Sequence, residues 1–122
     1  MLRGHLRQLA EVEVDRVLRE LPNEVALAMK GCSIRLPNTV HELSPEAGLE
    51  EDLLGLFEGA TWGEADEPGQ HPPCITLFLE AIWAEAAGDV EMFRKEVRLT
   101  LLHEIGHFLG WGEGEVEARG LG

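Results

Sequence analysis

Several features are scarce in this sequence, and each scarcity excludes a class of protein. The 122-residue chain has no apolar run near the ~20 residues that a membrane span needs, so we expect no membrane partner. Its first residues lack the apolar core of a secretory signal, which favours a cytoplasmic protein. Cys32 and Cys74 lie 42 positions apart, so the sequence predicts two buried free thiols rather than a disulfide framework.

Positive charge is also scarce. Ten Lys and Arg residues stand against 23 Asp and Glu residues, which gives a formal net charge of −13. A surface this acidic repels phosphate backbones, so we expect no nucleic-acid partner. The length and the share of apolar residues are those of an ordinary globular chain, and residues 1–122 are expected to form a single domain.

Helical spacing of apolar residues predicts a helix over residues 2–21, stopped by Pro22, and a short helix over 24–29 capped by Asn23. Strands are expected over residues 32–36, 53–57 and 74–79. Many acidic residues predict a loop with one helical turn over 38–52, and Gly and Pro predict a long loop over 58–73.

The last helix is the element with the clearest signals. Asp89 is a good N-cap, and Gly110 can end the helix. An apolar stripe steps by three and four residues through Val90, Phe93, Val97, Leu101, Ile105 and Phe108. The pattern therefore predicts an α+β domain, in which a small mixed sheet packs against an N-terminal helix and a long C-terminal helix.

The chemistry of the sequence is concentrated on this helix, in the run His103-Glu104-Ile105-Gly106-His107. Residues four apart lie about 40° apart around a helix axis, so His103 and His107 can bind the same metal ion. Two imidazoles suit Zn²⁺, and Glu104 can reach a water molecule on that metal as a general base. Two surface histidines on an ordinary helix are the alternative interpretation.

A catalytic zinc usually takes three protein ligands, so a third is needed. Gly110 would let the chain leave the helix and turn back toward the two histidines. Glu113, ten residues after His103, is the first candidate, and Glu115 and Glu117 are the alternatives.

The pattern HExxHxxGxx(H/D/E) resembles the zincin metallopeptidases. More closely, the chain is similar to the small bacterial zincin-like metallopeptidases, through the segments LLGLFEG (53–59), ITLF (75–78) and LLHEIGH (101–107). This resemblance implies a minimal zincin-like fold, in which His103 and His107 bind zinc and Glu104 is the base. The family more often has Asp where this chain has Glu113, and no methionine follows the motif.

The resemblance predicts a zinc-dependent peptidase. Only nine residues follow Glu113, so we expect an open site that acts on peptides or unfolded segments. Zincins bind the substrate main chain along a sheet edge, and residues 74–79 are the best match. The chain has no tyrosine to stabilise an oxyanion, and the sequence does not choose among His5, His41, His71 or an arginine.

Two other functions compete with this prediction. The first is a metal-binding module that is catalytically weak or inactive and uses its open face to bind a protein partner. The second is a metal-dependent nuclease of the HGxLHxxGxxH type, which the presence of Glu104 and the net charge of −13 disfavour.

Overall fold

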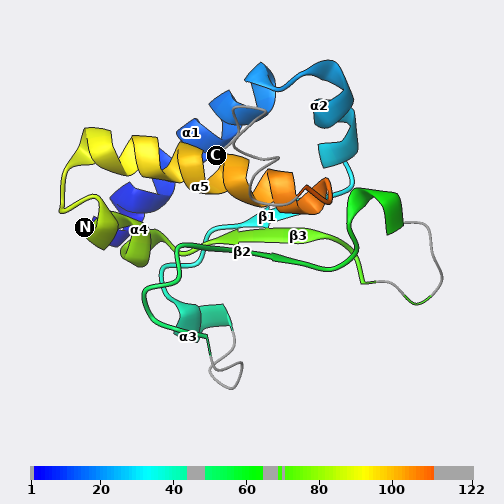
Figure 1. Cartoon of the computed structure of the whole chain (residues 1–122). Helices are drawn as coiled ribbons and strands as arrows, with labels where there is room; N and C mark the ends of the chain where they lie inside the picture. The colour runs from blue at the N-terminus through cyan, green and yellow to red at the C-terminus, as the bar shows by residue number, and fades with distance from the viewer. Residues whose placement is uncertain (1, 44–48, 65–68, 70, 112–122) are drawn as a thin grey trace.

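The computed structural model describes residues 2–43, 49–64, 69 and 71–111. The described residues combine helices with a small sheet, which confirms the predicted α+β class (Figure 1). The elements are α1 (Leu2–Glu20), α2 (Asn23–Met29), β1 (Ser33–Arg35), α3 (Val40–Leu43), β2 (Gly55–Glu58), the 3-10 turn η2 (Trp62–Glu64), β3 (Cys74–Leu77), α4 (Leu79–Glu85) and α5 (Val90–Phe108).

The three described strands form one mixed sheet in the order β1-β3-β2. Strand β1 runs parallel to β3 with Ser33 opposite Cys74, and β2 runs antiparallel to β3 with Gly55 opposite Leu77. Because β3 is paired on both sides, it has no open edge for a substrate strand, and the expectation for residues 74–79 was wrong. Strand β2 pairs with β3 alone among the described strands, so β2 offers a sheet edge.

The core lies between the helices and one face of the sheet. Figure 1 shows α1, α2 and α5 on one side of the sheet and α3 on the other. Helix α5 packs against α1, β2 and β3, so it is the element that joins the helical layer to the sheet. None of the described helices is both long and apolar enough to cross a membrane.

The apolar stripe of α5 is buried as predicted, except at its start. Phe93, Val97, Leu101, Ile105 and Phe108 are each at most 1% exposed, whereas Val90 is 42% exposed. Burial begins at Phe93 because Trp83 of α4 covers the helix there, with ring centroids 5.7 Å apart. Val90 lies before this cover and contributes little to the core.

One predicted helix cap is confirmed, and the ends of several other elements differ from the prediction. The Asp89 carboxylate accepts a hydrogen bond from the Met92 amide at 2.9 Å, which confirms the predicted cap of α5. Asn23 lies inside α2 and does not cap it. Residues 53 and 54 precede β2 rather than belonging to it, and residue 79, expected at the end of a strand, begins α4.

Helix α1 carries a buried charge that the apolar pattern did not reveal. The Glu13 side chain is 1% exposed and lies 3.4 Å from Arg16 and 3.7 Å from Arg98 of α5. Oε2 of Glu13 has no hydrogen-bond partner among the described residues. Two half-exposed arginines therefore balance this carboxylate at the junction of α1 and α5.

Both cysteines are free, as predicted. Cys32 is buried, whereas Cys74 is half-buried, with Nε of Arg35 3.2 Å from its Sγ. Burial, together with a smaller effect of the neighbouring Cys74, raises the pKa of the Cys32 thiol to about 11. Cys32 therefore stays protonated at neutral pH.

Candidate metal centre

Helix α5 brings its two histidines together on its last turns. The imidazole rings of His103 and His107 have centroids 4.7 Å apart and planes at 75° to one another. Both residues are half-buried, so part of each remains exposed to solvent. The predicted spacing of four residues therefore places both imidazoles at the same point of the surface.

Glu104 lies beside this pair and is only 9% exposed. Its carboxylate oxygen and the ring nitrogens of His103 and His107 all lie within 4.8 Å of one another. Two nitrogens bound to one tetrahedral zinc would be about 3.3 Å apart, so small side-chain rotations suffice to hold a metal ion. Among the described residues, these three side chains form the group that could bind one.

Strand β2 approaches α5 closely next to Glu104, at Gly55. A Cβ atom on Gly55 would lie 2.6 Å from Cγ2 of Thr100 and 3.3 Å from Cγ of Glu104. Only glycine therefore allows β2 to lie this close to α5. The segment LLGLFEG predicted a strand here but did not reveal the contact of Gly55 with the site.

A cavity of about 300 Å³ opens beside Glu104. Its lining includes Leu53, Leu54 and Leu99, together with Gly55, Thr100, His103 and Glu104. The three leucines make one part of the cavity apolar, and Thr100, His103 and Glu104 make the other part polar. It has the size and the lining to take an apolar side chain next to the two histidines.

The chain turns sharply where α5 ends. Gly110 has a φ of +82°, its amide donates to the His107 carbonyl at 2.9 Å, and the Trp111 amide donates to the Gly106 carbonyl at 3.0 Å. These two bonds form a Schellman motif, so Gly110 ends the helix as predicted. Glu113, Glu115 and Glu117 lie outside the described residues.

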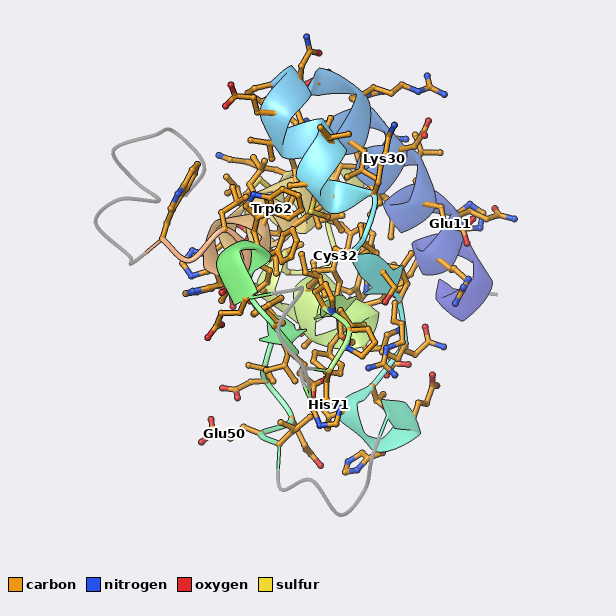
Figure 2. The ribbon with its side chains drawn as sticks, turned by 90° about the vertical axis from the view of Figure 1, so that its right-hand side faces the viewer. Glu11, Lys30, Cys32, Glu50, Trp62 and His71 are labelled. Carbon is orange, nitrogen blue, oxygen red and sulfur yellow. The ribbon has the colours of Figure 1, made fainter. Side chains whose placement is uncertain are left out.

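Three aromatic rings lie together near the end of α5. Phe108 is buried between Phe57 of β2, at 5.8 Å, and Trp62 of η2, at 6.3 Å. Trp62 is 51% exposed, so one face of its ring is open to solvent. Figure 2 shows Trp62 at the end of α5. Trp62 therefore lies at the rim of this aromatic group.

Comparison with known families identifies the family of this chain. The family profile of the zincin-like metallopeptidases matches residues 29–121, which is most of the chain. The chain belongs to this family. No curated protein matches the sequence. Membership of the family implies a metal, typically zinc, and a peptidase activity.

The residues of this zincin-like metallopeptidase fit such a metal. The ring nitrogens of His103 and His107 lie within 4.8 Å of one another and are donors that suit zinc, and the Glu104 carboxylate lies within the same distance of both. The match covers β1, β2, β3 and α5, so the family profile spans the sheet, the apolar cavity and the histidines together.

Proposed function

We propose that this zincin-like metallopeptidase is a zinc-dependent peptidase whose catalytic base is Glu104. His103 and His107 are the metal ligands contributed by α5. The observation that carries this proposal is the group of three side chains with ligand atoms within 4.8 Å, next to an apolar cavity. Zinc, when bound, supplies a Lewis acid that lowers the pKa of a water molecule and polarises a carbonyl group.

Glu104 moves the proton in the reaction. Its carboxylate accepts a proton from the water molecule whose oxygen attacks the peptide carbonyl carbon. A C–O bond forms, the C–N bond breaks, and Glu104 returns the proton to the leaving nitrogen. The other water proton stays on the new carboxyl group. Burial of Glu104 against β2 fixes its side chain for both transfers.

The third ligand is Glu113 in this proposal, with Glu115 and Glu117 as alternatives. The Schellman motif at Gly110 supports it, because this turn redirects the chain directly after the helix that carries the histidines. A carboxylate from the following segment would complete three protein ligands and leave a position for water.

The substrate main chain is proposed to lie along the edge of β2. This strand begins at Gly55, which contacts the site, and its second edge is unpaired among the described strands. A peptide added there would form main-chain hydrogen bonds. The cavity lined by Leu53, Leu54 and Leu99 would take an apolar side chain of the peptide next to the scissile bond.

The proposal is tested by incubating the zinc-loaded protein with a library of short peptides and reading the products by mass spectrometry. We expect cleavage beside apolar residues, loss of cleavage with a zinc chelator, and its return when zinc is added back. The His107→Ala variant should neither retain zinc nor cleave. Stoichiometric zinc without any cleavage would contradict the peptidase and favour an inactive metal-binding module.

A further inference from the structure

A second and larger cavity lies between α3 and α4. Its volume is about 480 Å³. Ala81 and Ala84 contribute apolar surface, and four carboxylates, from Glu51, Asp52, Glu80 and Glu85, line it. His41 also lines the cavity, with its Nε2 3.1 Å from Oε1 of Glu51. We call it the acidic cavity. No lysine or arginine is among its described lining residues.

The acidic cavity lies in the part of the chain that carries all of the net charge. Residues 36–93 contain 13 Asp and Glu and no Lys or Arg. The other ten acidic residues are matched in number by the ten Lys and Arg of the two flanking segments. In Figure 2, Glu50 lies on the side of the molecule away from α2 and Lys30. This separation of charge gives the cavity side a negative potential, which attracts cations.

The acidic cavity adjoins the proposed active site through a short segment. Glu51 and Asp52 line the acidic cavity, and the next residues, Leu53 and Leu54, line the apolar cavity beside Glu104. The Phe78 amide donates to the Leu54 carbonyl at 2.9 Å, and Phe78 lines the acidic cavity. A peptide that occupies the apolar cavity can therefore reach the acidic cavity within a few residues.

We propose that the acidic cavity binds a lysine or arginine side chain of the peptide substrate, which makes it a determinant of substrate specificity. This inference rests on the proposed peptidase function. The aliphatic stem of such a side chain fits the surface of Ala81 and Ala84, and its cationic end meets the carboxylates. The peptidase thus prefers peptides with a basic residue at a fixed distance from the scissile bond.

The test uses a peptide cleaved in the library experiment and three versions of it that carry arginine, norleucine or glutamate at one position. The three residues are placed in turn at each position near the scissile bond. At one of these positions we expect the arginine peptide to have a kcat/KM at least about tenfold above that of the norleucine peptide. The Glu85→Lys variant should lose this preference and cleave the glutamate peptide better. Glu85 is exposed at the last turn of α4, where a lysine suits the helix end.

The matched control is Glu20→Lys, which makes the same charge change at an exposed residue at the end of α1. It should keep the preference for arginine. Cleavage without a preference for a basic residue at any position would overturn the inference and leave the peptidase proposal intact. Equal losses in Glu85→Lys and Glu20→Lys would also overturn it, because the effect would then come from net charge alone.

A binding measurement separates the inference from the peptidase proposal. Fluorescence anisotropy of the labelled arginine and norleucine peptides is followed with the zinc-loaded Glu104→Gln variant, with and without Glu85→Lys. Tighter binding of the arginine peptide that Glu85→Lys removes would support the cavity even if nothing is cleaved. Equal binding of both peptides would contradict the inference. Displacement of the arginine peptide by calcium at low concentration would also contradict it, because the carboxylates would then form a site for a metal ion rather than for a side chain.

Discussion

In the described part of the chain two glutamates are buried, and their surroundings differ in kind. Glu13 of α1 is 1% exposed and lies between Arg16 and Arg98. Glu104 of α5 is 9% exposed and lies between two imidazoles and an apolar cavity. Each helix has 19 residues, and the two pack against one another, so the same layer of the protein contains both carboxylates.

The difference shows two ways of keeping a carboxylate inside a protein. A buried charge is costly unless other charges or hydrogen bonds compensate for it. At Glu13 the compensation is permanent, because arginine does not lose its proton, and the pair holds α1 to α5. At Glu104 the neighbours are metal ligands and a cavity that can admit water and substrate. The first arrangement suits structure, and the second suits proton transfer.

The largest expected effect comes from removing the charge at Glu104. Glu104→Gln should lower kcat for peptide cleavage by about 10²–10⁴-fold, because the amide cannot accept the proton from water. Zinc content, measured by elemental analysis, should stay unchanged. The matched change Glu13→Gln should leave kcat unaltered. A similar loss of activity in both variants would show that the two buried glutamates do not differ in function.

The next effect concerns the third zinc ligand. Glu113→Ala should weaken zinc binding by about 10–100-fold or more, because a metal ligand is lost. Competition with a fluorescent zinc chelator measures the affinity. Glu115→Ala and Glu117→Ala are the controls and should change it little. If one of them weakens zinc instead, the third ligand lies there.

A smaller effect is expected at the contact that positions Glu104. Gly55→Ala should lower kcat by about tenfold, because the new methyl group would displace Thr100 and Glu104. Thr100→Ser removes the Cγ2 atom that the methyl group would meet, so the double variant should regain much of the activity. Zinc affinity should stay the same throughout. If Thr100→Ser restores nothing, Gly55 acts in some way other than through this contact.

A moderate effect on stability is expected at the other glutamate. Arg98→Met should lower the free energy of unfolding by about 1–2 kcal/mol, because Glu13 then keeps only Arg16 and the lost pair is half-exposed. Glu13→Gln in the Arg98→Met background should recover most of this loss. Urea unfolding of the four proteins measures the coupling. Additive effects would contradict a charge pair between α1 and α5.

The effect that is smallest at neutral pH concerns a third buried acid, the Cys32 thiol, which keeps its proton there. Burial raises the pKa of Cys32 from its ordinary value of 9.0 to about 11, so the folded state holds this proton more tightly than the unfolded state. The free energy of unfolding should therefore fall as the pH rises between these two values. Urea unfolding at several pH values should show a weaker fall for Cys32→Ala. Equal slopes would contradict a raised pKa.

The sequence predicted well those features that depend on local periodicity. The stripe from Phe93 to Phe108 and the cap at Asp89 follow from helical spacing and hydrogen-bonding chemistry alone. The proximity of His103, Glu104 and His107 follows from the helix as well. Sequence reasoning fails where residues distant in the chain meet.

Three examples show this failure. The place of β3 at the centre of the sheet depends on pairing with β1 and β2, which local pattern does not reveal. The burial of Glu13 depends on Arg98, 85 positions later in the sequence. The role of Gly55 depends on its contact with Thr100, because nothing in the segment LLGLF itself shows how closely α5 approaches.

The most direct test of the metal centre is the X-ray absorption spectrum of the zinc-loaded protein at the zinc edge. The account predicts the scattering signature of two imidazole ligands. That signature should remain when His5, His41 and His71 are all replaced by glutamine, because His103 and His107 are the ligands. A zinc spectrum without imidazole scattering in either protein, or one that changes when those three histidines are replaced, would contradict the account.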